Sequence, residues 1–474
     1  MLIHIKSFGL YIVLLVAQLI AVWGCGDDGE DTPDVHDSEP SSDSEDTSDD
    51  GTIEYYKAHC PGKVNEVSDV YYCIVPSGEI TADSLEKETQ LDWIAGLTYV
   101  LDGRAFIGDD AEETILNIEP GALILGEAVT DVDNTAALII QRNSKIIAEG
   151  TKDNPIVFSS AKKVGDRESD DWGGLILNGK APINGGASEA TGEGSTGTYG
   201  GDEPDDDSGV LAYVRIEFSG KRITADKEFN GLTLQGVGRG TEIHHVQIHR
   251  AGDDSIEFFG GTAEVHHIVL SGSGDDSFDW TMGWQGKAQF VIAVGQSGVS
   301  TENGIEADNN ETNFDAEPRA NPTLYNFSFF NGKKLLFRRG TAATVVNFLN
   351  NTTQKCLDIA DNATWALAES GELSMTHSVV MKESCFLDDD LEKQGYSESE
   401  WWHSQEGNSV IEDFGVENAD DESTSPDYRL KADSPLWGAA GAPPADDDFF
   451  EATDYIGAMG DDDWTEGWTD YPEN

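Results

Sequence analysis

Two copies of one motif follow each other at a fixed interval near the middle of the chain. EIHHVQIHRAGDDSIEFFGGT begins at Glu242, and EVHHIVLSGSGDDSFDWTMGW begins at Glu264. Equivalent residues such as Asp253 and Asp275 are 22 positions apart (275 − 253 = 22). A period of this length is typical of a solenoid, in which each coil lies on the one before it. The chain is therefore expected to form a rod of stacked coils, with like side chains aligned in columns.

The segments on either side of the repeat have the pattern of short strands joined by sharp turns. ILNIEPGALILGEA and ALIIQRNSKIIAEGTKDNPIVFSSA alternate apolar with polar residues and are interrupted by Gly, Asn, Asp and Pro. Gly, Asn and Asp tolerate the positive φ that such corners need. We therefore predict an all-β solenoid over residues 111–400. An N-terminal cap segment (55–110) would cover its first coil, and a C-terminal strap (401–474) would pack along it.

The beginning of the chain has the features of an exported lipoprotein. A short region that contains Lys6 precedes an apolar run, and Gly24 stands directly before Cys25. This arrangement resembles a bacterial lipobox, which predicts a signal peptide over residues 1–24 and a diacylglycerol on Cys25. An ordinary signal peptide followed by a chance cysteine is the alternative. Residues 25–54 are acidic and poor in bulky apolar side chains, so a disordered tether is expected there, on a protein anchored by lipid at the outer membrane or cell surface.

The charge of the chain is strongly negative. The formal net charge is −61, and residues 26–54 contain thirteen Asp or Glu and no Lys or Arg, so −48 remains on the other residues (−61 + 13 = −48). Such a field repels nucleic acid and attracts cations. A nucleic-acid partner is therefore excluded, and either a cation-binding role or adaptation to a salty medium is expected.

Four cysteines follow Cys25, and an even number in an exported chain suggests disulfides. They are Cys60, Cys73, Cys356 and Cys385. Local pairing of the first two and of the last two is the simplest of three connectivities. A zinc site is the competing interpretation, although no CxxC spacing supports it.

Four motifs in the same order carry a resemblance to a known family. They are DWGGLILNGKAPIN, GDDSIEFFGGT, LLFRRGT and the closing YIGAMG with WTEGWT. The chain resembles, over roughly residues 110–474, a family of secreted or lipid-anchored bacterial proteins common in Bacteroidota and myxobacteria and similar to the pectin-lyase-like superfamily. The resemblance implies a right-handed parallel β-helix, and it says more about fold and location than about activity.

The repeat predicts a column of carboxylates on the outside of the rod. Equivalent positions on neighbouring coils lie about 4.8 Å apart, which places Glu257 beside Asp279, and a weaker third copy adds Glu306. Carboxylates so close repel one another unless a cation or protons neutralise them. The candidate calcium ligands are Asp253, Asp254, Glu257, Asp275, Asp276, Asp279, Glu306 and Asp308. Internal neutralisation by Arg338 and Arg339, or a catalytic carboxylate pair, are the alternatives.

Two further sets of side chains are candidates for binding. His244, His245, His266 and His267 form a second column, either as a zinc or copper site or as hydrogen-bonded ladder residues. Trp280 and Trp284 can stack on the apolar faces of sugar rings if they are exposed, whereas packing in the core is the commoner fate of a tryptophan.

These patterns favour a binding function over an enzymatic one. The favoured function is that of a non-catalytic surface protein that binds an extracellular glycan or protein, with calcium as its one expected cofactor and no organic cofactor. The alternative is a pectin-lyase-like polysaccharide lyase or hydrolase, for which Asp279, Glu306 and Arg338 are the catalytic candidates. Binding is preferred, because so negative a chain repels acidic polysaccharides unless calcium bridges them.

Overall fold

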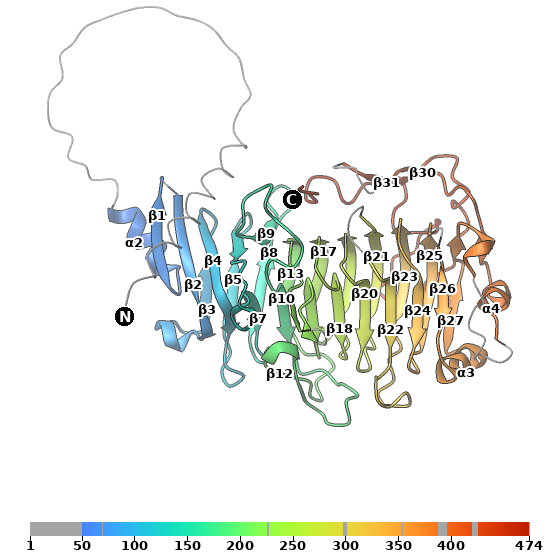
Figure 1. The fold of residues 1–474 in the computed structure, drawn as a ribbon, viewed down its shortest axis with the longest axis horizontal. Helices are drawn as coiled ribbons and strands as arrows, with labels where there is room; N and C mark the ends of the chain where they lie inside the picture. The colour runs from blue at the N-terminus through green and yellow to red at the C-terminus, as the bar shows by residue number, and fades with distance from the viewer. Residues whose placement is uncertain are drawn as a thin grey trace, which may run out of the picture.

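Stacked parallel strands form one long β-helix, in which successive coils follow each other along the rod (Figure 1). The computed structural model describes residues 50–68, 70–224, 227–296, 301–352, 354–386, 396–419 and 425–473. The predicted signal peptide, the predicted lipidation site Cys25 and the tether as far as residue 49 lie outside the described residues. The described residues form the all-β solenoid that the sequence predicts.

Three stacks of strands make up the walls of the rod. The first contains β3 (Gln90–Trp93), β5 (Ile115–Ile118), β8 (Lys145–Glu149), the first halves of β13 (Gly209–Glu217), β17 (Glu242–His249), β19 (Glu264–Ser271), β21 (Lys287–Val294), β23 (Thr323–Phe330) and β25 (Ala343–Asn350), and then β27 (Leu373–Thr376). The second contains the first parts of β2 (Val70–Ile80) and β4 (Leu97–Ile107), then β6 (Leu123–Gly126), β9 (Ile156–Ser160), the second halves of the same six long strands, β28 (Val379–Val380) and β29 (Ser409–Val410).

The third stack carries the predicted carboxylate column. It contains the ends of β2 and β4, then β7 (Ala137–Ile140), β10 (Leu175–Asn178), β16 (Leu232–Gln235), β18 (Ile256–Phe259), β20 (Asp276–Thr281), β22 (Asn303–Asp308), β24 (Leu335–Arg338) and β26 (Leu357–Ile359). Every pairing between these neighbours is parallel, so side chains at equivalent positions stand above one another along the rod.

A bend divides each of the six long strands between the first and second stacks. One residue with positive φ lies at each bend, and these residues are Tyr213, His245, His267, Phe290, Asn326 and Asn347. They form a column of their own, here called the bend column. Non-glycine residues adopt this conformation at a cost, which neighbouring contacts must offset.

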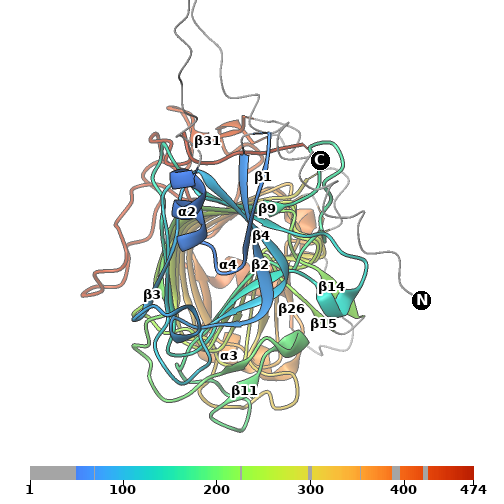
Figure 2. The ribbon, with the colours of Figure 1, turned by 90° about the vertical axis from the view of Figure 1, so that its left-hand side faces the viewer.

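Short elements lie outside the three stacks. At the N-terminal end, α2 (Asp50–Ala58) is followed by β1 (Lys63–Val67), which is antiparallel to β2 (Figure 2). The other helices are α3 (Asn362–Ser370) and α4 (Glu398–Ser404), and the remaining strands form the pairs β11 (Ala190–Thr191) with β12 (Thr198–Tyr199), β14 (Arg222–Thr224) with β15 (Lys227–Glu228), and β30 (Val416–Asn418) with β31 (Asp427–Leu430). Parallel pairing already joins β2 to β4, so the ladder begins inside the segment 55–110 that was expected to be only a cap.

Two disulfides join the cysteines in the locally paired arrangement. Cys60 is bonded to Cys73, and Cys356 is bonded to Cys385. The first ties the end of α2 to β2, and the second joins two segments near the C-terminal end of the rod. The simplest of the three connectivities is thus confirmed.

The predicted strap (401–474) begins later in the structure, since β29 still pairs with the coils. Residues 425–473, called the strap from here on, run back along the outside of the rod from its C-terminal end (Figure 1). Amide side chains of the coils hold the strap backbone in pairs of hydrogen bonds. Gln247 donates to the carbonyl of Asp470 at 2.7 Å and accepts from its N–H at 2.9 Å, and Gln289 bonds Glu451 in the same way at 2.7 and 2.8 Å. The strap is therefore in register with the coils. Within the described residues, no helix combines the length and hydropathy that a membrane span requires.

Candidate functional site

Carboxylates from consecutive coils stand in one column on the outer face of the third stack. Glu257 pairs in register with Asp279, and Asp279 pairs with Glu306. Phe278 and Trp280, on either side of Asp279, point into the core and are fully buried, so Asp279 points outward. The register predicted from the 22-residue repeat is confirmed.

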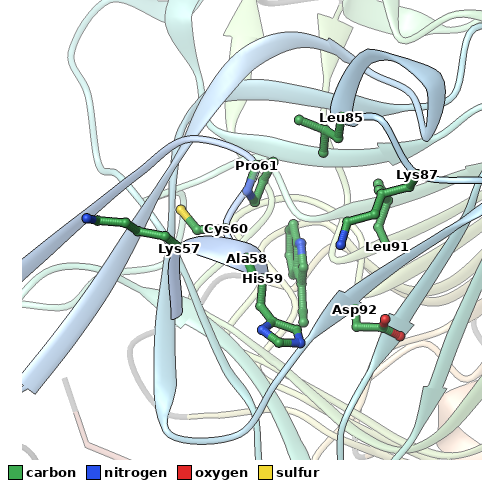
Figure 3. Close-up of a pocket in the computed structure, with 10 residues that line it drawn as sticks. Lys57, Ala58, His59, Cys60, Pro61, Leu85, Lys87, Leu91 and Asp92 are labelled. Atoms are coloured by element: carbon green, nitrogen blue, oxygen red, sulfur yellow. The ribbon is translucent and has the colours of Figure 1, made fainter. Parts of the chain in front are cut away.

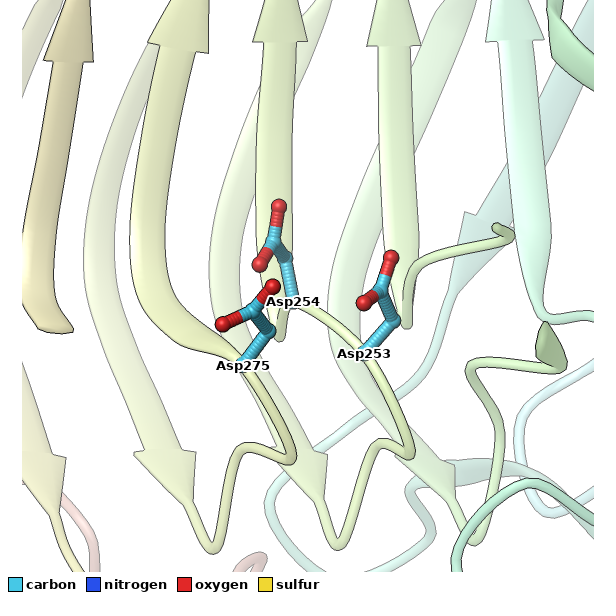
Figure 4. Close-up of side chains that lie close together, drawn as sticks. All are labelled: Asp253, Asp254 and Asp275. Atoms are coloured by element: carbon cyan, nitrogen blue, oxygen red, sulfur yellow. The ribbon is translucent and has the colours of Figure 1, made fainter. Parts of the chain in front are cut away.

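The turns that precede these strands add three more carboxylates and the first residue of β20 adds a fourth, so that three overlapping groups form. The groups are Asp253, Asp254 and Asp275; Asp254, Glu257 and Asp279; and Asp276, Asp279 and Glu306, with one oxygen of each residue within 4.8 Å of those of the others in its group. Figure 4 shows the first group, with Asp254 and Asp275 turned toward each other. We call these seven residues the carboxylate column.

Most of the carboxylate column is withdrawn from water. Asp254 and Asp279 are 6% and 9% exposed. Backbone groups of the next coil hold two of the carboxylates, since the Asp276 N–H donates to Asp254 Oδ1 at 2.8 Å and the Asn303 N–H donates to Asp276 Oδ1 at 2.7 Å. Each of these bonds spans two coils, so the stacking itself fixes how the oxygens point.

Several buried oxygens in and beside the column have no hydrogen-bond partner among the described residues. They are Asp253 Oδ1, Asp279 Oδ1, Asn230 Oδ1 and Asn303 Oδ1. Asn230 donates from Nδ2 to Glu257 at 2.5 Å, and Asn303 donates from Nδ2 to Glu306 at 3.2 Å, so both amide groups sit against the carboxylates. A buried oxygen without a donor is costly, and its usual remedy is a cation, a proton or an ordered water.

Burial raises the pKa values of these carboxyl groups, and their mutual repulsion adds to the effect. The pKa of Asp253 rises to about 8 and that of Asp275 to about 6. Burial likewise raises the pKa of Glu306 to about 7, although Arg338 opposes the rise. Four other carboxyls have pKa values raised well above their ordinary range, chiefly by burial: Asp254, Glu257, Asp276 and Asp279. Near neutral pH the column therefore takes up protons or needs a cation.

Arginines neutralise the C-terminal end of the column, as the alternative interpretation expected. Arg338 forms ion pairs with Glu306 and, at 2.8 Å, with Asp308, while Arg339 contacts Asp308 at 2.6 Å. Asp308 is therefore a partner of arginine and does not belong to the three groups of the carboxylate column, and its role as a calcium ligand stays a prediction. Burial alone would lower the pKa of Arg338, but hydrogen bonds and charge from Asp308 and Glu306 raise it, which disfavours Arg338 as a catalytic base.

We expect Arg338→Gln to lower the free energy of unfolding by about 2 kcal/mol at pH 7, because it leaves the largely buried Glu306 without its cation and Asp308 with Arg339 alone. The loss should shrink at pH 5, where Glu306 can take up a proton. Urea unfolding at the two pH values measures both effects. Arg429→Gln is the control: Arg429 pairs with Asp427 in an exposed setting, so its loss should change the stability little at either pH. An equal loss at both pH values would contradict this account of the column.

The two tryptophans predicted to stack on a ligand lie inside the rod. Trp280 and Trp284 are fully buried, and their indole N–H groups donate to Thr341 Oγ1 at 3.0 Å and to the Ala263 carbonyl at 3.2 Å. The Phe258 ring stacks on Trp284 with centroids 4.0 Å apart. Neither indole can reach a sugar, so the prediction of ligand stacking is wrong, because both side chains fill the core between coils.

The histidine column forms a hydrogen-bonded ladder. His244 contacts His245 through their Nδ1 atoms at 2.9 Å, and His266 contacts His267 likewise at 2.7 Å. His245 and His267 belong to the bend column and stack on each other with centroids 4.6 Å apart. Trp464 of the strap covers His267 edge-on at 5.0 Å. The ladder interpretation fits these contacts, and the column joins the strap to the coils.

Sequence reasoning missed one oxygen donor beside the carboxylate column. Asn303 could be aligned with Asp276 from the repeat, and the register confirms that pairing. Asn230 lies outside the repeated motif, in the turn before β16, and only its contact with Glu257 reveals it. No signal in the sequence distinguishes it from other turn asparagines.

Comparison with known proteins agrees with this architecture. A family described as a pectate-lyase like beta helix domain matches residues 84–439. No curated protein and no solved structure matches the chain. The matched range spans most of the coils, from the segment before β3 to the strap, and includes the whole carboxylate column. The chain therefore belongs to the family of pectate-lyase-like β-helix domains.

Proposed function

We propose that this chain is an exported β-helix protein that binds calcium in the carboxylate column and an extracellular glycan or protein along its surface. The lipobox-like start of the chain supports a lipid anchor at the outer membrane or cell surface as part of this proposal. The observation that carries the calcium site is the position of Asp279. Its carboxylate is shared by two of the three groups, is 9% exposed and has an oxygen without a donor among the described residues.

The chemistry of the donors favours calcium over other cations. All seven side chains of the column offer carboxylate oxygens, and the neighbouring Asn230 and Asn303 offer amide oxygens. Calcium takes six to eight oxygen ligands in flexible geometry, whereas zinc prefers nitrogen and sulfur, and magnesium keeps several waters. A cation there would relieve the repulsion between the coils. It could also bridge the protein to an acidic ligand that the net charge would otherwise repel.

Calcium is expected to raise the thermal midpoint at pH 8, since a ligand at 100 times its dissociation constant stabilises a protein by about 2.7 kcal/mol. The effect should be smaller at pH 6. Protons compete for the column there, given the raised pKa values of Asp253 and Glu306. Melting curves with calcium and with chelator at both pH values provide the measurement.

Asp279→Asn should abolish the calcium effect, because it removes the carboxylate that two groups share. Asp433→Asn, an exposed position on the strap, is the matched control and should leave the effect unchanged. An unchanged midpoint for the native chain at pH 8, with calcium and with chelator, would remove the cation site from the proposal.

A second candidate function is a polysaccharide lyase or hydrolase, which the family match favours. Asp279 and Glu306 lie in one group of carboxylates, and their raised pKa values would suit a general acid. The pairing of Arg338 with Glu306 and Asp308 weighs against a lyase base. Incubation with a broad glycan panel distinguishes the functions. Release of unsaturated or reducing sugar that Glu306→Gln abolishes would establish the enzyme, and binding without release would support the binding function.

A further inference from the structure

A cavity of about 280 Å³ lies at the N-terminal end of the rod, far along the chain from the carboxylate column. Its walls come from the end of α2, from the turn after β2 and from β3. Lys57, His59, Leu85, Lys87, Leu91 and Trp93 are among the lining residues (Figure 3). This volume is close to the lower end of the range for sites that bind small molecules.

The charges around the cavity differ from those of the rest of the chain. The chain has 29 Lys and Arg against 90 Asp and Glu, yet the lining contains two lysines and a histidine against the single carboxylate of Asp92. Asp92 is already engaged, since it accepts hydrogen bonds from Gln90 at 2.5 Å and from Asn117 at 3.1 Å. Among the lining residues, lysines outnumber carboxylates, in contrast to the chain as a whole.

Lys87 is the cation that is free to meet a ligand. Figure 3 shows its ammonium group directed toward the middle of the cavity, whereas Lys57 is directed away from it. Lys57 forms an ion pair with Glu54 at 2.7 Å, and Lys87 has no ion-pair partner among the described residues. An anion in the cavity would give Lys87 a partner without breaking an existing contact.

Fixed contacts hold the walls in place. The Cys60–Cys73 disulfide anchors the end of α2, and the Tyr99 hydroxyl donates to the His59 carbonyl at 3.2 Å. The His59 ring contacts the Tyr55 carbonyl through Nδ1 at 2.8 Å, and a carbonyl can only accept, so Nδ1 carries the proton. A site whose walls are already ordered loses little conformational entropy when a ligand binds.

The floor of the cavity combines apolar surface with one unused donor. Trp93 is 1% exposed and stacks on Tyr99 with centroids 4.5 Å apart. Its indole Nε1 is buried with no hydrogen-bond partner in the described part of the chain. Leu85 and Leu91 supply apolar surface beside it. The lining thus offers apolar surface on one side and the Lys87 ammonium group on the other.

We propose that this cavity binds a small organic carboxylate that carries an apolar ring or chain. The carboxylate pairs with Lys87, and the apolar part lies against the apolar side of the lining, which includes Leu85, Leu91 and Trp93. The net charge of the chain does not prevent this, because charges farther away than about 8 Å are largely screened at physiological ionic strength. The site is independent of the carboxylate column and takes ligands of opposite charge.

Phenylacetate and its neutral isostere phenylacetamide are suitable probes, titrated calorimetrically into the full chain. Chelator is kept in the buffer, so that no cation in the carboxylate column can bridge the probe to the protein. We expect phenylacetate to bind with a dissociation constant on the order of 1 mM or tighter, and phenylacetamide to bind at least about tenfold more weakly, since it cannot form the ion pair.

Lys87→Gln should weaken phenylacetate binding about tenfold and leave phenylacetamide unaffected, because only the carboxylate forms the ion pair. Lys163→Gln changes the net charge equally at an exposed site and serves as the matched control. Equal binding of the two probes, binding that survives Lys87→Gln, or no heat from phenylacetate at 10 times the expected constant (about 10 mM) would each overturn the proposal. A failure of calcium to bind the column would not affect this result.

Discussion

Acidification from pH 7.5 to pH 5 is expected to release the strap from the coils. Burial lowers the pKa of His245 to about 3, that of His267 to about 2 and that of His249 to about 3. All three rings lie against strap residues, among them Trp464, Trp468 and Tyr471. They are therefore neutral in the folded protein at every pH where the strap is in place.

The sign of the effect follows from proton uptake. Unfolded histidine has a pKa of about 6.5, so below that pH the unfolded or detached state binds more protons than the folded state. The neutral histidines stabilise the docked strap fully above about pH 6.5, and this stabilisation is lost as the pH falls from there toward about 3. At pH 5, His249 and His267 each stabilise the docked strap by about 2 kcal/mol less than at neutral pH, since each pH unit corresponds to about 1.4 kcal/mol. The less buried His245 contributes less, because solvent screens it. Charge from His244 and His266 adds to the effect at His245.

Hydrogen exchange of strap peptides between pH 7.5 and pH 5, corrected for the intrinsic exchange rate, measures the release locally. A local probe is needed because the carboxylate column makes the opposite contribution to the pH dependence of stability. Its raised pKa values favour the folded state at low pH, and this contribution is lost as the pH rises from about 4 toward about 8 when no cation is bound.

His245→Asn and His267→Asn provide the matched test. Asn326 and Asn347 occupy equivalent places in the bend column with positive φ, so asparagine suits the backbone there. The double variant should lose most of the pH dependence of strap exchange. His403→Gln, at a half-exposed site on α4, should keep it. Strap protection that stays constant to pH 5 in the native chain would show that the histidines do not control docking.

Trp280→Ala is expected to lower the free energy of unfolding by about 3–5 kcal/mol, because it opens a cavity between coils that cannot close up. The change also leaves the Thr341 hydroxyl without the indole N–H that now donates to it. Trp280→Phe keeps most of the volume and should cost clearly less. Urea unfolding of the three proteins gives the comparison.

The same variants distinguish a core role from the ligand-stacking role predicted from the sequence. A core residue changes stability first, and any loss of glycan binding then follows the unfolded fraction. Native stability of Trp280→Ala together with lost glycan binding would contradict the buried position of the indole.

The 22-residue repeat was sufficient to predict the coils and their register. One period equals one turn of the rod, so it fixed which residues stand above one another, and Glu257, Asp279 and Glu306 fall in register as expected. Local spacing also predicted both disulfides, because the paired cysteines are only 13 and 29 residues apart in the chain. These features depend on residues that are close in sequence or related by the repeat.

Only the tertiary structure decided what covers each column and which side chains are accessible. The strap meets Gln247 from 223 residues away, and Asn230 reaches Glu257 from a turn outside the repeat. The tertiary structure likewise decided that Trp280 lies in the core, that Asp308 pairs with Arg338, and that a cavity forms around Lys87. A period specifies the order of side chains along a rod. Their burial, and with it their charge state, depends on distant segments that the period does not encode.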